Sequence, residues 1–287
     1  MENLEYYSYA KINLFLEVLS KRPDGYHNIK SLFARVGLSD KLLFFTDKTQ
    51  KINIQIINNT NAFSIKKEEN LVYKATMEFF SAFSIKRGIN ITIEKNIPLG
   101  AGLGGGSSNC AVTLLALSKI FNIENEQRIY EIGAKLGSDV PFFISDFSFA
   151  ICQGRGEIVS PISPKSKLPD VLIIVPDIHI STKDVYSSME YGYLPETNRL
   201  DDFILKLSLG GRVDFSKYLF NRLESSSFKI AGEIKKIKEK IISYGADALM
   251  SGSGSGVFAV SYDRSLLEYL RNEFAKIYNF VFLTKFV

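Results

Sequence analysis

The sequence has few cysteines, little net charge and no long apolar run, and each shortage narrows the classes of protein to consider. Only Cys110 and Cys152 occur among the 287 residues, and their spacing is not that of a zinc or redox site. A disulfide framework is therefore excluded, and we expect a protein of the reducing cytoplasm.

Membrane and secreted classes are also disfavoured. No window approaches the roughly 18 consecutive apolar residues that a spanning helix needs. The opening residues MENLEYYSYA lack a basic segment followed by an apolar one. We expect a soluble, cytoplasmic chain with no membrane partner.

The charge balance is close to neutral. The sequence has 35 Lys and Arg against 31 Asp and Glu, a formal net charge of +4. Its one dense basic run, KKIKEK at residues 235–240, has apolar neighbours at helical spacing, which favours a solvated helix face over a nucleic-acid surface. We expect no nucleic-acid partner, and the mild excess suits an anionic small molecule.

The composition is typical of a soluble globular chain, with 46% apolar and 23% charged residues. At about 150 residues per domain, the length favours two domains. The segment SPISPKSKLPD at residues 160–170 carries three prolines and lies between two strand-like stretches. It predicts a boundary there, with domains at residues 1–160 and 161–287.

Hydrophobic periodicity predicts mixed helices and strands. Alternation predicts that the strand at residues 6–19 is half buried, with Lys11, Asn13 and Glu17 on its polar side. Ser181 and Asp184 form a capping-box pattern. The other predicted strands are residues 52–56, 89–93, 150–159, 171–175, 248–250 and 257–261 and one near the C-terminus. The predicted helices are residues 70–83, about 107–121, 125–136, 230–243 and 265–277.

The segment IPLGAGLGGGSS at residues 97–108 lies between a predicted strand and a predicted helix, with five glycines in seven positions. Missing side chains allow backbone N–H groups to approach a phosphate, and a following helix N-terminus adds further donors. Such a placement favours an anion site over a flexible linker.

Three nucleotide-binding classes do not fit. A dinucleotide fingerprint needs an acidic residue about 20 positions later at a strand end, but Glu124 and Glu126 introduce a helix. A Walker A motif needs Gly-Lys-Ser/Thr, whereas this segment ends Gly-Ser-Ser. The His-Arg-Asp and Asp-Phe-Gly signatures of protein kinases are missing.

The segment instead resembles the phosphate-binding motif of the GHMP kinases, P-x-G-x-G-L-G-S/G-S-S. AKINL at residues 10–14, RPDGYH at 22–27 and SGSGSG at 251–256 accompany it. The combination is similar to the members that phosphorylate the 2-hydroxyl of diphosphocytidyl methylerythritol in the non-mevalonate route to isoprenoid precursors. The resemblance covers nearly the whole chain.

That resemblance implies an α+β, two-domain GHMP kinase fold. Its N-terminal domain would be similar to domain 2 of ribosomal protein S5, and its C-terminal domain would be ferredoxin-like. ATP would be the phosphoryl donor, with Mg²⁺ bridging its β- and γ-phosphates. The ion would contact Ser107 or Ser108, because no motif carboxylate is evident to anchor it, and its ligands are otherwise unknown.

The resemblance also implies roles for individual residues. Asp139 would be the catalytic base, although an N-cap role fits it equally well on sequence alone. Lys11 would stabilise charge on the attacking oxygen, where periodicity alone favours an exposed lysine. The substrate-binding residues would be Asn13, Tyr26, His27, Thr182 and Tyr186. The ATP-binding residues would be Asn70, Lys95, Pro98, Leu99, Gly100, Ala101, Gly102, Leu103, Gly104, Gly105, Gly106, Ser107 and Ser108.

In this reading an aromatic pair, Tyr26 and Tyr186, would hold the cytosine while His27 reads its edge. The 251–256 segment would close over phosphates. Cys110, near the start of a helix, would have a lowered thiol pKa. We expect a monomer or weak homodimer.

Three alternatives stay open: a related kinase acting on homoserine or mevalonate, a nucleotide sensor that binds ATP without transferring phosphate, and a dinucleotide oxidoreductase. The RPDGYH turn and the AKINL opening argue against the first, Lys11 and Asp139 against the second, and the missing acidic residue against the third.

Overall fold

The computed structural model describes residues 3–60, 66–189 and 199–287. The chain forms two compact units, and neither is one continuous stretch. Unit 1 comprises Met1–Ala10, Leu38–Leu99 and Gly104–Asp146, and unit 2 comprises Lys11–Gly37, Gly100–Leu103 and Phe147–Val287. The long strands β1 (Asn3–Lys21) and β2 (His27–Asp47) contribute residues to both. The division of the chain at residue 160 stays a prediction.

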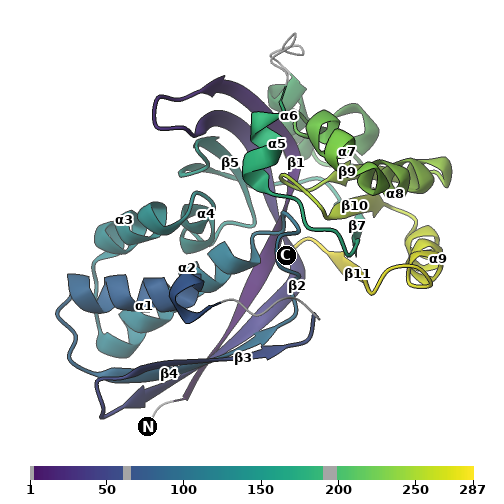
Figure 1. Ribbon diagram of the computed structural model, residues 1–287. Coiled ribbons are helices and arrows are strands. Elements are labelled where there is room, and N and C mark those ends of the chain that lie inside the picture. Colours follow the sequence, from purple (N-terminus) through teal and green to yellow (C-terminus); the bar gives the residue numbers. More distant parts are fainter. Residues whose placement is uncertain (1–2, 61–65, 190–198) are drawn as a thin grey trace. The chain divides into compact units, whose positions relative to one another are not determined.

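The described residues of unit 1 form sheet strands and four α-helices. Strands β3 (Ile52–Asn58) and β4 (Gly88–Lys95) are parallel, and β4 pairs antiparallel with Lys41–Asp47 of β2. Helix α1 (Leu71–Ala82), which connects β3 to β4, packs against β3. It also contacts α2 (Gly105–Phe121) and α3 (Glu126–Leu136), while α2 and α3 both contact the short α4 (Val140–Ile144). Figure 1 shows α1 and α2 on the same side of β3 and β4.

The helix boundaries in unit 1 follow local signals in the sequence. The Asn70 side chain caps α1 by accepting a hydrogen bond from Val72 N, and Asn125 caps α3 through Arg128 N. Both helices are confirmed within one residue at each end. Helix α2 begins two residues before its predicted start, because Gly104 adopts a left-handed conformation (φ 70°) that turns the chain into the helix.

In unit 2, the predicted strand 150–159 is wrong. The residues form a hairpin of β5 (Phe149–Gly154) and β6 (Ile158–Ile162), because Gly154 (φ 69°) and Gly156 (φ 128°) take left-handed conformations that reverse the chain. Strand β5 pairs with Ile29–Ala34 of β2, and the two-residue strand β8 (Phe220–Asn221) pairs in parallel with Phe15 and Leu16 of β1.

Unit 2 also contains a four-stranded antiparallel sheet with the spatial order β11-β7-β10-β9. Its strands are β7 (Asp170–Val175), β9 (Asp247–Met250), β10 (Val257–Ser261) and β11 (Phe280–Lys285). Numbered along the chain, this order is 4-1-3-2, with helices between the first two strands and between the last two. It is the predicted ferredoxin-like pattern.

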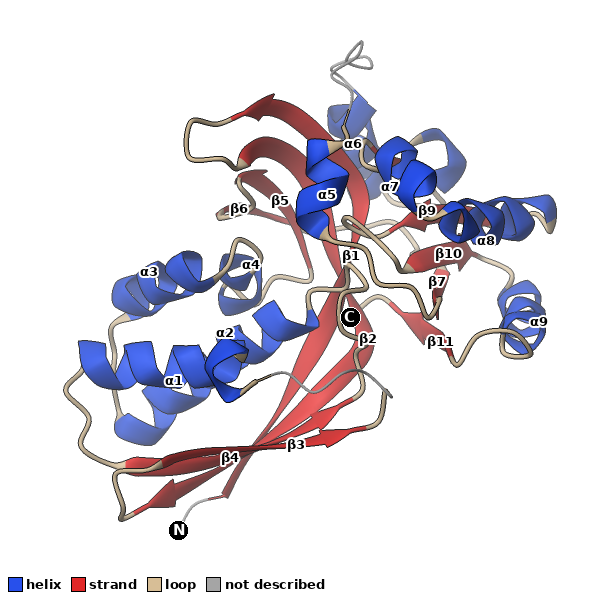
Figure 2. Cartoon of the chain, viewed as in Figure 1, coloured by secondary structure: helices blue, strands red, loops and turns tan. Residues whose placement is uncertain are grey.

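The helices of unit 2 are α5 (Thr182–Ser187), α6 (Arg199–Leu209), α7 (Glu224–Ile230), α8 (Gly232–Ser243) and α9 (Arg264–Phe274). Figure 2 distinguishes them from the strands. The described residues also include two 3₁₀ turns, Lys67–Glu69 in unit 1 and Phe215–Lys217 in unit 2. Ser181 caps α5 by accepting from Asp184 N, as its capping-box pattern predicts.

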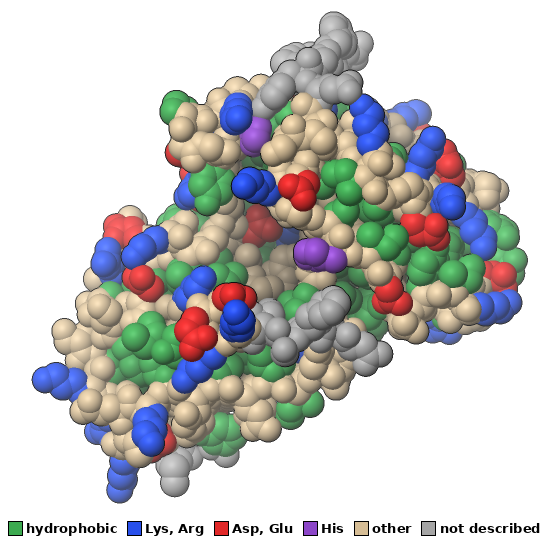
Figure 3. Space-filling view, viewed as in Figure 1, with side chains coloured by type: hydrophobic (Ala, Val, Ile, Leu, Met, Phe, Trp, Pro, Cys, Tyr) green, Lys and Arg blue, Asp and Glu red, His purple; other side chains and the backbone are tan. Residues whose placement is uncertain are grey.

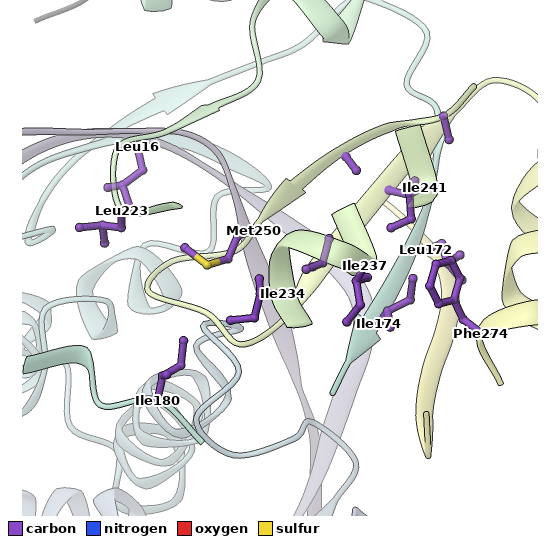
Figure 4. Packing of buried hydrophobic residues seen from close by; sticks show 14 of the residues in the cluster. Leu16, Leu172, Ile174, Ile180, Leu223, Ile234, Ile237, Ile241, Met250 and Phe274 are labelled. Atoms are coloured by element: carbon purple, nitrogen blue, oxygen red, sulfur yellow. The ribbon is translucent and has the colours of Figure 1, made fainter. Parts of the chain in front are cut away.

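The core beside the four-stranded sheet comes from α8, α9 and the inner face of the sheet. Ile237 and Ile241 of α8 point toward Leu172 and Ile174 of β7, and Ile234 lies nearer to Met250 (Figure 4). These six side chains are all at most 1% exposed. The apolar period of α8 thus buries one face of the helix.

The KKIKEK run lies on α8, where Lys235 and Lys236 are exposed while the isoleucines between the charges are buried. The predicted solvated helix face is therefore confirmed. Basic and acidic side chains are interspersed on the face displayed in Figure 3. Among the described residues, no helix is both long enough and apolar enough to cross a bilayer.

The alternation in β1 predicts that its polar side faces solvent, but the structure buries that side. Lys11, Asn13 and Glu17 are 3%, 2% and 7% exposed. Burying such groups is costly unless each has polar partners, so their contacts indicate what this strand does.

Candidate active site

Lys11 is held by contacts within unit 2. Its Nζ donates hydrogen bonds to Asn13 Oδ1 at 2.7 Å and to the carbonyl oxygen of Gly102 at 2.9 Å. It also lies 4.8 Å from the centroid of the Phe33 ring, a cation–π distance. The ammonium is therefore oriented by buried partners.

A relay of hydrogen bonds fixes which way Asn13 faces. Ser31 Oγ donates its single hydrogen to Phe15 O at 2.5 Å, so toward Asn13 it acts as the acceptor, and Asn13 Nδ2 donates to it at 3.0 Å. Asn13 must then present Oδ1 to Lys11. An amide nitrogen carries two hydrogens and Ser31 takes one, so Asn13 keeps a donor for a substrate hydroxyl, the role predicted for it.

The first part of the glycine-rich segment, residues 100–103, lies against the SGSGSG stretch in unit 2. Ser251 Oγ donates to Gly102 O at 2.9 Å, and Gly256 N donates to Ala101 O at 3.1 Å. A Cβ on Gly102 would lie 2.0 Å from Ser251 O, so only glycine permits this approach. The 251–256 stretch is thus a packed loop and not a linker.

The second part of the segment opens α2 in unit 1. Ser108 is 1% exposed, and its hydroxyl is hydrogen-bonded to Ser8 Oγ at 2.8 Å. Ser8 Oγ also lies 2.6 Å from Asn109 Oδ1. Ser107 is only half-buried. Of the two serines predicted to contact phosphate or Mg²⁺, Ser107 is the more accessible.

A buried ion pair supports the entry to the glycine-rich segment. Lys95 Nζ lies 2.5 Å from Asp40 Oδ2, with side-chain exposures of 7% and 0%. Asp40 Oδ1 accepts hydrogen bonds from Asn96 N and Ile97 N, both at 2.7 Å. Burial lowers the pKa of Lys95, and the charge of Asp40 opposes that shift. The pair fixes the backbone immediately before Pro98.

A Cβ on Gly105 would lie 3.0 Å from Lys95 Nζ, so the ammonium sits beneath the first turn of α2. Asn70, the other residue predicted to approach adenine, has its side-chain oxygen engaged in capping α1. Adenine contacts by these two residues stay predictions.

Asp139 occupies the N-cap position of α4, with Pro141 in the first turn as predicted. Its carboxylate makes no capping hydrogen bond to that helix. Asp139 therefore occupies the N-cap position, but its side chain does not act as a cap. The catalytic role stays a prediction.

Two residues predicted to bind the nucleobase are stacked on each other in unit 2. The rings of His27 and Tyr186 have centroids 4.8 Å apart and an interplanar angle of 27°. Tyr26 is 52% exposed, and the Arg155 guanidinium lies 5.0 Å from its ring centroid. A cytosine that stacks on the same face of Tyr186 would displace His27. The cytosine sandwich stays a prediction.

Thr182 is joined to the SGSGSG stretch, since its Oγ1 lies 2.8 Å from Ser253 Oγ in a hydrogen bond. This contact connects the segment predicted to bind ribose or phosphate with the loop packed on Gly102. Within the RPDGYH turn, Arg22 pairs with Asp24 at 3.0 Å.

The lowered thiol pKa predicted for Cys110 is wrong. The side chain is fully buried in α2, and burial raises the pKa of the thiol to about 12. Cys110 is the sixth residue of α2 and lies beyond its first turn, so the loss of solvent around a thiolate decides the shift.

Sequence reasoning missed Ser31, Asp40 and Asn221, which are all buried and hydrogen-bonded to predicted site segments. Each lies outside the recognised motifs. An isolated polar residue within an apolar stretch is the one signal that could have found them.

The described residues contain no group of three or more His, Cys, Asp or Glu side chains arranged to hold a metal. Magnesium commonly takes few protein ligands and keeps substrate phosphates and water, so the hydroxyl of Ser107 fits an ion carried by a nucleotide.

Two domain families match the chain: the GHMP kinases N terminal domain over residues 70–147 and the GHMP kinases C terminal domain over residues 204–279. A Thermodesulfovibrio yellowstonii protein named 4-diphosphocytidyl-2-C-methyl-D-erythritol kinase is 42% identical over 262 residues, covering 88% of each chain. A Clostridium perfringens protein of the same name is 35% identical over 285 residues, covering 97% of this chain and 96% of the relative.

Solved structures agree. The crystal structure of a 4-(cytidine 5'-diphospho)-2C-methyl-D-erythritol kinase superimposes with a TM-score of 0.80 at 27% identity, covering 98% of both chains. A homoserine kinase from Cytophaga hutchinsonii, with a TM-score of 0.74 at 15% identity over 100% of this chain and 96% of its own, shares the fold alone. The predicted two-domain α+β fold is confirmed.

The buried pair gives a first prediction. Replacing Asp40 by Asn keeps the shape but leaves the Lys95 ammonium without its counter-charge, which should destabilise unit 1 by about 3–5 kcal/mol. Urea unfolding measures the loss. Asp214→Asn, which breaks the exposed pair with Lys217, is the matched control and should leave the urea midpoint unchanged.

A double variant, Asp40→Asn with Lys95→Met, removes the stranded charge and should recover part of the stability lost in Asp40→Asn. Equal urea midpoints for Asp40→Asn and the unmodified protein would show that the pair does not support the segment.

His27 gives a second prediction. Burial lowers its pKa below the ordinary 6.5, and the nearby charge of Lys21 lowers it further. Because the folded pKa is depressed, the contribution of His27 to stability is complete above pH 6.5 and is lost as pH falls through the folded value. An NMR titration of the two histidines, assigned with His27→Gln, should therefore give a pKa below 6.5 for His27. A pKa above 6.5 would contradict this prediction, because protonation of His27 would then stabilise the fold.

Proposed function

The chain belongs to the GHMP kinases, in the family of the 4-diphosphocytidyl-2-C-methyl-D-erythritol kinases, and from this membership we propose its reaction. The protein transfers the γ-phosphoryl group of ATP to the 2-hydroxyl of 4-diphosphocytidyl-2-C-methyl-D-erythritol. It is thus a phosphotransferase with an alcohol acceptor, in the non-mevalonate route to isoprenoid precursors. We further propose that it acts in the cytoplasm, as a monomer or weak homodimer.

The observation that carries the proposal is the environment of Lys11. Its ammonium contacts Gly102 of the glycine-rich segment, and Ser251 of the SGSGSG stretch donates to the same carbonyl oxygen. Three sequence motifs that lie far apart along the chain therefore meet at one backbone atom. A buried cation beside a glycine-rich backbone is suited to stabilise the negative charge of a phosphoryl-transfer transition state.

In the proposed reaction the substrate 2-hydroxyl oxygen forms a bond to the γ-phosphorus of ATP, and the bond from that phosphorus to the β–γ bridging oxygen breaks. ADP leaves with the electron pair. Asp139 accepts the hydroxyl proton, and Lys11 stabilises charge on the attacking oxygen. Asn13 orients that oxygen through its remaining amide hydrogen.

The nucleotide phosphates would be bound by backbone N–H groups of the glycine-rich segment and by the start of α2, where donors are unpaired. Ser107 would supply an oxygen to a bound Mg²⁺, which neutralises charge on the β- and γ-phosphates. Pro98 and Leu99 would complete this segment.

Recognition of the cytidine end is assigned to Tyr26, His27, Thr182 and Tyr186. The lowered pKa of His27 keeps its imidazole neutral near pH 7, so one ring nitrogen donates and the other accepts. A neutral imidazole is suited to the mixed donors and acceptors on the edge of cytosine.

Initial rates of ADP release test the proposal against its alternatives. With ATP and Mg²⁺, turnover should depend on the diphosphocytidyl substrate and be inhibited competitively by CDP. Faster turnover of mevalonate or homoserine would assign the protein to another branch of the superfamily. ATP binding without turnover of any alcohol would identify a nucleotide sensor, and binding of NAD in place of ATP would favour a dinucleotide enzyme.

Asp139→Asn gives the third prediction. Losing the proton acceptor while keeping the shape should lower kcat by about 10²–10⁴-fold, with the KM for ATP almost unchanged. Asp202→Asn, an exposed aspartate in the first turn of α6, is the control and should behave like the unmodified enzyme. Undiminished turnover in Asp139→Asn would remove this carboxylate from the mechanism.

A further inference from the structure

Within the proposed function, on which this inference rests, we propose that Asn221 is a positioning residue for phosphoryl transfer. Its buried carboxamide holds the 251–256 loop against residues 101–103. The carbonyl oxygen of Gly102 is thereby kept where it orients the Lys11 ammonium.

The carboxamide of Asn221 is fully used. Asn221 follows Phe220 in β8, stands opposite Leu16 of β1 and is 5% exposed. Its Nδ2 donates to Met250 O and to Gly252 O, both at 2.8 Å. Its Oδ1 accepts from Leu223 N at 2.9 Å, a contact that only the oxygen can make, so the orientation of the amide is determined.

Of the two carbonyls that Asn221 binds, that of Met250 immediately precedes the 251–256 loop and that of Gly252 lies within it. Within the loop, Gly254 N donates to Ser251 O and Ser251 N donates to Gly256 O, both at 2.9 Å. These bonds close the loop on itself, so a tether at its first residues controls the position of the whole turn.

The loop in turn is in backbone contact with residues 101–103. A Cβ on Gly256 would lie 2.6 Å from Ala101 O, so the two backbones have no room between them at this point. A Cβ on Gly252 would lie 3.5 Å from Lys11 Nζ. Movement at Gly252 is therefore transmitted directly to the surroundings of Lys11.

Two other side chains, Glu224 and Ser227, also bind the backbone of this loop or the residue before it, through atoms that Asn221 does not contact. Glu224 Oε1 accepts from Met250 N at 3.0 Å, and Ser227 Oγ donates to Ser253 O at 3.1 Å. Asn221 is the side chain that joins the carbonyl before the loop to the carbonyl of its second residue. Its loss should shift the loop without releasing it from the fold.

The test is Asn221→Asp, which is nearly isosteric. The change keeps the acceptor for Leu223 N but replaces both N–H donors with an oxygen facing two carbonyl oxygens. Because a misplacement of about 1 Å can cost 10²-fold in rate, kcat should fall about ten- to hundredfold. The KM values for ATP and the diphosphocytidyl substrate should change much less.

Asn53→Asp is the matched control. Asn53 lies in β3, and its exposed amide donates to Asn90 Oδ1 at 2.9 Å, so the same substitution removes a donor that belongs to unit 1 and not to the loop. Its kcat should equal that of the unmodified enzyme. Equal kcat per folded chain in Asn221→Asp and the unmodified enzyme would overturn the proposal.

A pH profile separates positioning from a loss of folded protein. Lowering the pH protonates the introduced carboxyl and restores one O–H donor toward Met250 O or Gly252 O. The ratio of variant to unmodified kcat should then rise from pH 8 toward pH 6. A constant ratio, as expected for a fixed fraction of inactive chains, contradicts positioning.

Hydrogen exchange gives a readout independent of turnover. The Gly256 amide donates to Ala101 O, and its exchange should be faster in Asn221→Asp than in the unmodified protein. An unchanged rate overturns the proposal, whereas failure of the unmodified protein to phosphorylate the substrate refutes only the proposed function. If Asn221→Asp does not fold, Asn221→Ala decides, because it removes both donors without placing an oxygen against the two carbonyls: a lowered kcat per folded chain supports the tether, and an unchanged kcat refutes it.

Discussion

The carbonyl oxygen of Gly102 accepts hydrogen bonds from Lys11 Nζ and from Ser251 Oγ, each at 2.9 Å, and the site in unit 2 is built around this atom. A carbonyl oxygen has two lone pairs, so it can serve both donors at once. The Lys11 ammonium is thereby oriented by the Gly102 carbonyl oxygen together with Asn13 Oδ1.

Glycine is required at this point for a physical reason. Ser251 O would lie 2.0 Å from a Cβ on Gly102, and Gly102 has φ 71°. A side chain there would clash with the facing loop and strain its own backbone. The glycine-rich segment therefore serves backbone packing as well as its proposed phosphate contacts.

In unit 1, a buried ion pair fixes the backbone that leads into the glycine-rich segment. The Asp40–Lys95 pair is buried, and its carboxylate also accepts two backbone N–H groups that precede the glycine-rich segment. An unpaired ion there would be costly, so pairing fixes both the strand end and the turn. Each unit thus places its part of the segment through buried polar contacts, where position is most sensitive to single substitutions.

Much of the fold could be predicted because its signals are local. The caps at Asn70 and Ser181, the alternation in β3 and β4, and the apolar face of α8 depend on residues within a few positions of one another. The hairpin at β5 and β6 was missed although Gly154, Arg155, Gly156 and Glu157 form a polar, glycine-containing turn signal between its two strands.

In the candidate site, too, some features could be predicted from the sequence and others could not. The motif residues could be found from their resemblance to a family, but their burial could not, because period-two alternation does not say whether a strand is covered on both faces. Asp40 and Asn221 were missed since their partners are 55 and 31 residues away. Cys110 does lie near the start of its helix, as predicted, but its burial raises the thiol pKa where the prediction was a lowered one.

The central claim, that this chain phosphorylates the methylerythritol moiety of a cytidine diphosphate derivative, is tested most directly by the identity of the product. A ³¹P NMR spectrum of the enzyme with ATP, Mg²⁺ and the diphosphocytidyl alcohol should gain one phosphomonoester resonance in step with ADP, while the two diphosphate resonances of the substrate persist. Formation of ADP with inorganic phosphate alone, or no reaction, would contradict the account.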